Sequence, residues 1–195
     1  DHQGELVDGD ELIYLIARER QRAGRAVGGV VGTLMSNLGM EKAIQALGLE
    51  FVRANVGDRY VMAALESRGW TLGGEASGHI VCLDKATTGD AIVAALQVLD
   101  AMVSSGKSLH DLKAGMSKYP QVLINVRLAQ KIDVKTVPSV QKAVAHAEAR
   151  LADQGRVLLR ASGTEPLIRV MVEGADAVLV QELAEELAEV VRNSL

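Results

Sequence analysis

The sequence predicts two domains, an α/β domain with a mixed sheet followed by a small α+β two-layer domain. Three observations carry this prediction. Strand and helix patterns alternate from about residue 27 to residue 118, which is typical of a largely parallel sheet with right-handed crossovers. Tyr119-Pro120 then interrupts the regular patterns and marks a boundary. The remaining residues have the pattern strand, helix, hairpin and helix, which suits two layers.

Residues 1–25 have the pattern of a strand remnant and a turn, followed by an amphipathic helix. Asp8 and Asp10 suit the start of this helix, because acidic side chains cap and stabilise helix N-termini. Arginines suit its last turn, and Gly24 ends it.

Residues 26–118 make up the predicted α/β domain. The expected elements are, in order, a strand at 30–34, a short helix ending at Gly48, a strand at 51–56 and a helix ending at Gly69. Trp70–Leu83 is predicted to be a hairpin that turns at Gly74–Gly78. The helix from Asp90 to Met102 exposes little polar face, so it is expected to be buried.

Residues 119–195 make up the predicted α+β domain. A strand is expected at Val122–Val126, and Pro138 suits the first turn of the helix that follows. Two strands then flank a polar turn. A last helix has apolar residues on one face and most of the glutamates on the other.

Composition limits the class of protein. The chain has 195 residues, 48% of them apolar, and a net charge of −4 without a basic stripe of interleaved aromatics, so nucleic acid is not an expected partner. It has no long uninterrupted apolar span and no signal peptide, so we expect a soluble protein without a membrane partner. The single cysteine, Cys82, lies in an apolar run and is expected to be buried and reduced, which fits the cytoplasm.

A polar turn between two apolar strands is the first candidate site. Its candidate binding groups come from Arg160, Ser162, Gly163, Thr164 and Arg169. Two guanidinium forks, two hydroxyls and the backbone N–H groups of a turn suit a doubly charged phosphate. Glycine-containing hairpins that bind nothing are common, so a purely structural turn is the alternative.

The hairpin turn Gly74–His79 is the second candidate site. Glu75 and Ser77 alternate to the same side, and a carboxylate can accept hydrogen bonds from two adjacent sugar hydroxyls. The alternative is a plain hairpin end with Glu75 and His79 in solvent. Asp58 and Arg59, where a strand meets a helix, form a third candidate; there the alternative is an ordinary Asp N-cap.

Two of these segments resemble motifs of the α-D-phosphohexomutases. Residues 160–169 match the family's phosphate-binding loop, R-x-S-G-T-E-P-x-[IL]-R, and residues 75–79 lie in a match to its sugar-binding loop, G-E-x-S-G-H. Three further stretches resemble one branch of the family, the bacterial phosphoglucosamine mutases: Gly32–Asn37, Val56–Val61 and Leu83–Asp90. The resemblance covers nearly the whole chain.

The resemblance also shows what this sequence lacks. The family's enzymes have a nucleophilic serine in their first domain and a D-G-D-G-D-R metal loop in their second, and neither motif occurs here. We therefore expect a C-terminal part of a mutase, inactive by itself, with no catalytic residue and no metal ligand. The implied domains are residues 1–25 as the tail of the second domain, packing on little here, 26–118 as the third and 119–195 as the fourth.

The implied function is the interconversion of glucosamine 6-phosphate and glucosamine 1-phosphate through a phosphoserine and a bisphosphate, on the route to UDP-N-acetylglucosamine and the cell wall. The implied sugar contacts are Asp58, Arg59, Glu75, Ser77, Gly78 and His79. The implied phosphate contacts are Arg160, Ser162, Gly163, Thr164 and Arg169.

The resemblance also implies cofactors and partners for the full enzyme. The implied cofactors are Mg²⁺, bound by an upstream domain, and glucosamine or glucose 1,6-bisphosphate as activator or intermediate. The implied partners are a hexosamine phosphate substrate, the N-terminal mutase domains and a second copy of the full enzyme in a homodimer. The alternatives are a sibling phosphomannomutase or phosphoglucomutase, and a non-catalytic phosphosugar-binding module.

Overall fold

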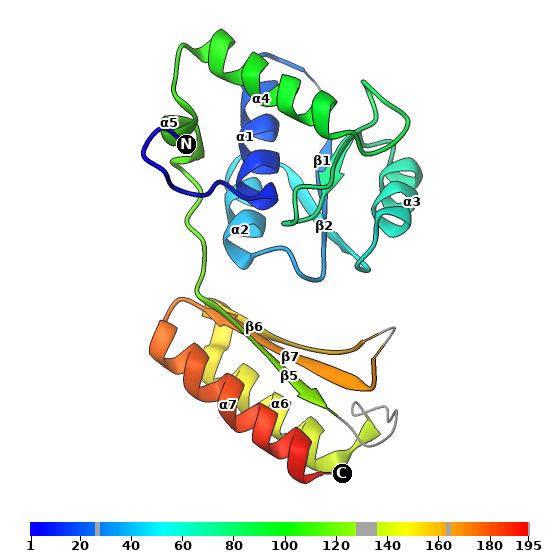
Figure 1. Cartoon of the computed structure of the whole chain (residues 1–195), viewed down its shortest axis with the longest axis vertical. Helices are drawn as coiled ribbons and strands as arrows, with labels where there is room; N and C mark the ends of the chain where they lie inside the picture. Colours follow the sequence, from blue (N-terminus) through cyan, green and yellow to red (C-terminus); the bar gives the residue numbers. More distant parts are fainter. Residues whose placement is uncertain (26–27, 128–135, 163–164, 195) are drawn as a thin grey trace. The chain divides into compact units, whose positions relative to one another are not determined.

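The computed structural model describes residues 1–25, 28–127, 136–162 and 165–194 (Figure 1). The chain forms two compact units, Asp1–Lys118 and Tyr119–Leu195, which we call unit 1 and unit 2. Each unit has an apolar core of its own.

Unit 1 contains a mixed four-stranded sheet with the strand order β2-β1-β3-β4. Its strands are β1 (Gly29–Thr33), β2 (Glu50–Ala54), β3 (Leu72–Gly74) and β4 (Ile80–Cys82). The first three are parallel, and β4 pairs with β3 in the antiparallel direction. This confirms the predicted mixed sheet and the hairpin predicted at its edge.

Helices cover both faces of this sheet. The main core lies on the face that carries Val30 and Leu72, together with α1 (Gly9–Arg22), α2 (Leu38–Ala46), α4 (Ala91–Ser105) and α5 (Leu109–Lys113). A smaller core on the opposite face joins Val31 to α3 (Asp58–Arg68). Successive crossovers therefore run on opposite faces, and the carboxyl ends of such strands are where α/β sheets bind ligands.

Helix α1 is an integral part of unit 1, contrary to the expectation that it would pack on little of this chain. Ile13 and Leu15 are fully buried among residues of α2, α4 and the sheet. Asp8 caps the helix, and its carboxylate and that of Glu11 bind each other's backbone N–H groups in a capping box. The sequence pattern located the helix but not its partners, because an apolar stripe does not say which surface covers it.

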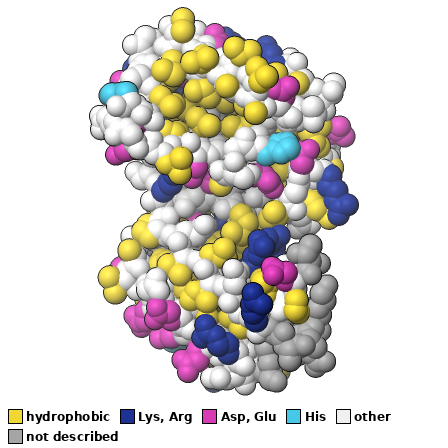
Figure 2. All heavy atoms as spheres, in the orientation of Figure 1, with side chains coloured by type: hydrophobic (Ala, Val, Ile, Leu, Met, Phe, Trp, Pro, Cys, Tyr) yellow, Lys and Arg dark blue, Asp and Glu magenta, His cyan; other side chains and the backbone are white. Residues whose placement is uncertain are grey.

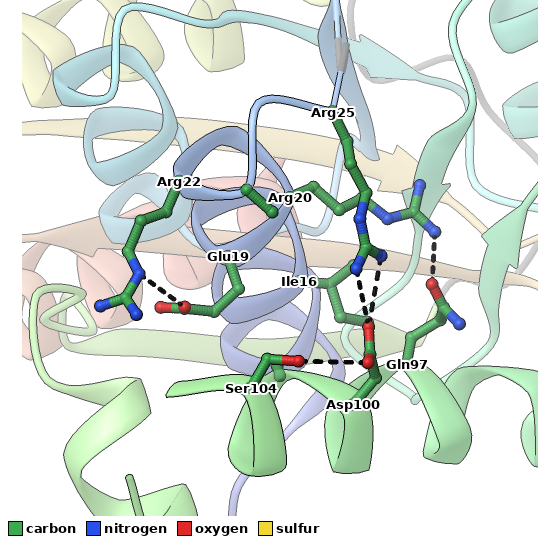
Figure 3. A pocket seen from close by; sticks show the side chains of 10 residues that line it. Ile16, Glu19, Arg20, Arg22, Arg25, Gln97, Asp100 and Ser104 are labelled. Atoms are coloured by element: carbon green, nitrogen blue, oxygen red, sulfur yellow. Dashed lines mark hydrogen bonds and ion pairs between the residues drawn. The ribbon is translucent and has the colours of Figure 1, made fainter. Parts of the chain in front are cut away.

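The C-terminal end of α1 is fastened to α4 by polar contacts around a pocket of about 220 Å³ (Figure 3). Arg20 is almost completely buried and donates to Gln97 Oε1 at 3.0 Å; its other terminal nitrogen lies 3.0 Å from Asp84 Oδ1. Arg25 binds Asp100 Oδ2 at 3.2 Å through both terminal nitrogens. Because the guanidinium groups of Arg20 and Arg25 already bind side chains of this chain, we interpret them as structural contacts around the pocket and not as ligand-binding groups.

Helix α4 is only half buried, so the prediction of a buried helix is wrong for one of its faces. Ala94, Val98 and Ala101 face the core. Large apolar side chains on the other face are exposed: Ile92, Leu96, Leu99 and Val103. Figure 2 shows hydrophobic side chains gathered where Figure 1 draws α4. The prediction failed because the helix is apolar on nearly all sides, whereas unit 1 packs against only one of its faces.

Unit 2 is a two-layer α+β domain, as predicted. Its elements are β5 (Gln121–Arg127), α6 (Pro138–Leu151), a 3₁₀ turn (Ala152–Gln154), β6 (Gly155–Ala161), β7 (Leu167–Gly174) and α7 (Ala177–Asn193). The antiparallel sheet has the order β5-β7-β6. Val170 and Val172 pack with α6 and α7 in its core, so both helices cover one sheet face. Alternation turns Arg169 to the other face.

Among the described residues, no helix combines the length and the apolar character needed to cross a lipid bilayer.

Candidate functional site

The predicted sugar-binding residues lie in the turn between β3 and β4, which backbone hydrogen bonds close tightly. Glu75 N–H donates to His79 O and Gly78 N–H to Glu75 O, each at 3.0 Å. Gly78 has a φ of +95°, which favours glycine. A Cβ on Gly74 would lie 2.4 Å from His79 O, so only glycine fits there without a shift. The glycines of the motif thus have a local structural reason.

Glu75 faces the start of α3. Its Oε1 accepts a hydrogen bond from Gly57 N–H at 2.9 Å, and Gly57 is the N-cap residue of that helix. A carboxylate is stabilised there by the unpaired N–H groups and the helix dipole. Since no hydrogen bond to Oε2 occurs among the described residues, this second oxygen can accept from a ligand.

His79 meets the same helix one residue further on. Its Nε2 lies 3.1 Å from Asp58 Oδ1, and both side chains are partly exposed. Asp58 is the first residue of α3 rather than its cap, since the cap is Gly57 and no side chain caps the helix. The structure therefore brings Glu75, His79 and Asp58 together, although at least 17 positions separate the loop from the helix start in the sequence.

Arg59 and Ser77 behave differently from their neighbours. The Arg59 guanidinium stacks on the ring of Tyr60 at 4.5 Å and donates to its hydroxyl at 2.5 Å. Among the described residues, Arg59 forms no hydrogen bond or ion pair with the hairpin turn. Ser77 is exposed at the tip of the turn, and its hydroxyl has no partner in the ranges that the structure covers.

The N-terminal end of α1 packs against the hairpin turn between β3 and β4. Gly9 N–H donates to Ala76 O at 3.0 Å, and a Cβ on Gly9 would lie only 2.1 Å from Glu75 O. Asp8 and Glu11 in turn bind Lys118 Nζ at 2.9 and 2.7 Å. Gly9 could not be identified from the sequence, because nothing local distinguishes a glycine that a distant loop approaches from any other glycine at a helix start.

The predicted phosphate-binding turn, the first candidate site of the sequence, lies between β6 and β7. Ser162 is buried, and its Oγ accepts a hydrogen bond from Glu165 N–H at 3.3 Å. Ser162 N–H donates to Leu167 O at 2.9 Å, which closes the turn. Gly163 and Thr164, predicted as phosphate contacts, lie outside the described residues.

Two arginines face each other across the strands that lead into this turn. Arg160 on β6 pairs directly with Arg169 on β7, on the sheet face away from the helices. Directly opposite residues have Cβ atoms about 5 Å apart, and like charges in that arrangement destabilise a sheet. Within the described part of the chain, Arg169 forms no ion pair or hydrogen bond through its side chain. An anion with several oxygen atoms could accept hydrogen bonds from both guanidinium groups.

A third arginine, missed by sequence analysis, lies at the same end of the sheet. Arg127 ends β5 and pairs with Leu167, two positions from Arg169 on β7. Diagonal neighbours on one sheet face are about 7 Å apart. Arg127 is exposed and lines a pocket of about 120 Å³ with Glu165, Pro166 and Leu167. Only the strand pairing reveals it, because its own sequence neighbourhood carries no motif.

The free thiol of Cys82 and a cluster of carboxylates with a histidine have structural roles. Cys82 is buried and free, and burial raises the pKa of its thiol, which lowers its reactivity. One cluster among the described residues has metal-ligating atoms, Asp1, Glu5 and His110. Lys113 Nζ already lies 2.5 Å from Glu5 Oε2 and 3.2 Å from Asp1 Oδ2, so an ammonium occupies the place of a cation. These residues do not fit a Mg²⁺ site.

Comparison with protein families gives a match over both units. Residues 8–119 match the model for phosphoglucomutase/phosphomannomutase, alpha/beta/alpha domain III. Residues 123–190 match the model for the C-terminal domain of the same family.

Relatives of known name are phosphoglucosamine mutases. The protein of Methylococcus capsulatus is 64% identical over 188 residues, which cover 96% of this chain and 42% of that protein. The protein of Hahella chejuensis is 59% identical over 195 residues, 100% of this chain and 44% of that protein. The chain thus spans less than half the length of these relatives.

Solved structures similar to this chain include mutases of hexosamine phosphates. The N-acetylphosphoglucosamine mutase of Aspergillus fumigatus, in complex with GlcNAc-6P and magnesium, superposes with a TM-score of 0.80 at 25% identity. That match covers 96% of this chain and 47% of the other. A variant of the fungal enzyme bound to glucose 1,6-bisphosphate matches with the same TM-score and identity.

Proposed function

Because this chain belongs to the phosphoglucomutase/phosphomannomutase family, we propose that it supplies the sugar-binding and phosphate-binding parts of a phosphoglucosamine mutase. The full enzyme would interconvert glucosamine 6-phosphate and glucosamine 1-phosphate. The observation that carries the proposal is the Arg160–Arg169 pair, two cations facing each other beside a hydroxyl-bearing turn. The names of the bacterial relatives favour this branch over mutases of mannose or glucose phosphates.

Unit 2 would bind the phosphate that is not being transferred. Arg160 and Arg169 would each offer a planar fork of N–H donors, which matches the oxygens of a phosphate. Ser162 would hold the shape of the turn through its bond to Glu165 N–H, and Gly163 and Thr164 complete the proposed set. Arg127 would add a third positive charge at the rim, because it ends the neighbouring strand with no ion-pair partner among the described residues.

Unit 1 would bind the sugar. Glu75 offers one free carboxylate oxygen, Ser77 an exposed hydroxyl and His79 a ring nitrogen, so the turn presents mainly acceptors to a ligand rich in hydroxyl donors. Gly78 would contribute its backbone to the same turn. Asp58 and Arg59 stay in the proposed sugar set, Asp58 through its contact with His79.

The contribution of these residues to the reaction would be positioning. A bisphosphate intermediate must present each of its phosphates in turn, so its anchors must accept either orientation of the sugar. Contacts with the phosphate that does not react supply binding energy that orients the reacting end. The phosphoserine and Mg²⁺ would belong to other parts of the proposed full enzyme, whereas the residues of this chain bind and orient the substrate.

The remaining parts of the proposal concern the setting of the full enzyme. Its product, glucosamine 1-phosphate, would feed the synthesis of UDP-N-acetylglucosamine and the cell wall. The single buried thiol of Cys82 suits a reducing compartment, so we place the enzyme in the cytoplasm, and a homodimer is the proposed assembly.

The test is binding of glucosamine 6-phosphate to the 195-residue chain, measured by calorimetry or NMR titration. Arg160→Ala and Arg169→Ala should each weaken binding about 30- to 150-fold, which corresponds to about 2–3 kcal/mol of charge-assisted hydrogen bonding. Arg192→Ala is the matched control, because Arg192 lies in the last turn of α7 and is exposed on the helix layer.

An unchanged affinity in both sheet variants, or an equal loss in Arg192→Ala, would contradict the proposal. A preference of the parent chain for glucosamine 6-phosphate over inorganic phosphate should disappear in Glu75→Ala while phosphate binding persists. Persistence of that preference would argue against the sugar role of the hairpin turn.

A further inference from the structure

The N–H groups at the start of α1 are bound by two different parts of the chain. Such groups have no partner within the helix itself. The carboxylates of the capping box accept hydrogen bonds from the N–H groups of Asp8 and Glu11. The N–H group of Gly9, the first residue of the helix, instead donates to Ala76 O in the hairpin turn at 3.0 Å. The capping box is local, whereas the Gly9 bond joins α1 to the proposed sugar-binding turn.

The backbone of the hairpin turn lies directly against Gly9. A Cβ on Gly9 would lie 2.1 Å from Glu75 O and 2.7 Å from Gly78 N. It would also lie 3.0 Å from Ala76 O. Three residues of the turn therefore contact this one glycine, so a displacement of the first turn of α1 would also displace the backbone that presents Glu75 and Ser77.

The two acids of the capping box share one counter-ion. Their mutual hydrogen bonds, at 3.0 and 3.2 Å, hold the carboxylates of Asp8 and Glu11 near each other, where like charges repel. Lys118 Nζ lies 2.9 Å from Asp8 Oδ2 and 2.7 Å from Glu11 Oε2. Among the described residues, no other basic side chain forms an ion pair with either acid. Because Glu11 is only 7% exposed, its charge is costly without the ammonium of Lys118.

The backbone next to Lys118 packs against the start of α2. A Cβ on Gly39, in the first turn of that helix, would lie 2.0 Å from Ser117 O. The starts of α1 and α2 are themselves joined, since Asp10 Oδ2 accepts a hydrogen bond from Asn37 N–H at 2.7 Å. Residues of unit 1 thus hold the ammonium beside the capping box, although Lys118 is the last residue of that unit.

We propose that Lys118 is a positioning residue for the sugar-binding turn. Its ammonium keeps the capping box of α1 closed, and the closed box holds Gly9 against Ala76. This contact fixes the backbone that carries Glu75 and Ser77. The inference rests on the proposed function for its ligand, and Lys118 acts through α1 without touching the sugar.

The experiment is amide hydrogen exchange of the 195-residue chain, followed by NMR. The Gly9 amide reports the contact directly, because Ala76 O is its acceptor and the first residue of a helix has no acceptor within the helix. In Lys118→Ala, the Gly9 amide should exchange about fivefold faster than in the parent, while the amides of the buried strand β1 keep their rates. Lys118→Arg, which keeps the cation, should retain the protection of Gly9.

A second variant tests whether Lys118 acts through the capping box. Glu11→Gln keeps an oxygen that can accept from Asp8 N–H but removes the repulsion between the two acids. In that background, Lys118→Ala should change the Gly9 rate much less, because the two sites act through one interaction. Lys107→Ala is the matched control, since Lys107 is an exposed lysine of unit 1, and it should leave the rate unchanged.

Three results would overturn the proposal. They are an unchanged Gly9 rate in Lys118→Ala, an equal acceleration of the β1 amides, and an effect of Lys118→Ala that is as large with Glu11→Gln as without it. The second result would mean that Lys118 only stabilises the fold.

Glucosamine 6-phosphate and inorganic phosphate are then titrated into the same chains. Lys118→Ala should weaken binding of glucosamine 6-phosphate about fivefold and leave binding of inorganic phosphate unchanged, because the proposed phosphate groups lie in unit 2. An unchanged affinity for glucosamine 6-phosphate in Lys118→Ala would also overturn the proposal. If the parent does not bind this ligand while the Gly9 rate still depends on Lys118, the proposed function fails and the positioning of the turn stands.

Discussion

Asp10 is a single buried carboxyl that joins the starts of two helices. Only 1% of the residue is exposed, and its Oδ2 accepts a hydrogen bond from Asn37 N–H at 2.7 Å. Asn37 is the N-cap of α2. The sequence predicted a capping role for both Asp8 and Asp10, but the N-cap of α1 is Asp8. Burial raises the pKa of Asp10 to about 6, because desolvation disfavours the carboxylate.

Asp10 should therefore make stability depend on pH in a direction unusual for a carboxyl. Above pH 6 the folded chain must hold a buried carboxylate; between pH 6 and pH 3.8 the folded state binds a proton that the unfolded state does not, so this group stabilises the fold as pH falls. Relative to the parent, Asp10→Asn should gain about 2.5 kcal/mol more at pH 7.5 than at pH 4.

Urea unfolding at the two pH values measures this difference. Glu66→Gln is the control, since Glu66 is an exposed acid on α3 and should show a much smaller change. Parallel pH profiles for Asp10→Asn and the parent would mean that Asp10 is not desolvated in the folded chain.

Among the helices, α4 has two faces with different roles. Its inner face packs Ala94, Val98 and Ala101 against the core, while Leu96 and Leu99 on the outer face are 56% and 52% exposed. Burial of an apolar side chain stabilises in proportion to the area removed from water. The outer leucines therefore contribute little to the fold of this chain.

Replacing Leu96 and Leu99 together by Gln should change the free energy of unfolding by less than about 1 kcal/mol and reduce self-association of the chain. Val98→Ala, on the inner face of the same helix, should cost about 2 kcal/mol. Urea unfolding and light scattering measure the two effects. A large loss of stability in the leucine variant would show that its outer face packs on the protein.

Across the full chain, the two units have separate cores. Val170, Leu183 and Leu187 are buried in unit 2 among residues of that unit alone. The antiparallel sheet and the two helices close this core within residues 119–195. Folding of unit 2 therefore requires no residue of unit 1 in its core.

Residues 119–195 produced alone should fold cooperatively and bind inorganic phosphate as tightly as the 195-residue chain. The physical reason is that Arg160, Arg169 and Ser162 all lie on or beside two strands of the same small sheet. Circular dichroism during thermal unfolding and NMR titration measure both properties. Arg169→Ala in this shorter chain should stay folded and lose the binding, and a folded but non-binding parent would contradict the prediction.

Local sequence signals were enough to predict the features that depend on neighbouring residues. Glycines, prolines and period-2 or period-3.6 patterns indicated the order of helices and strands, the hairpin at Gly74–Gly78 and the turn between Arg160 and Arg169. These signals are local, because a turn needs a glycine at a given φ and a helix needs its cap within three residues. The two candidate loops were found for the same reason.

The packing of the chain established which distant residues meet. It placed α1 in the core of unit 1, left one face of α4 in solvent, and set Asp58 against His79 and Arg127 near Arg169. These contacts join residues separated by many positions, and they depend on strand order and on which helix covers which sheet face. An apolar stripe or a lone charge carries no information about its partner, because burial and pairing are properties of the packed chain.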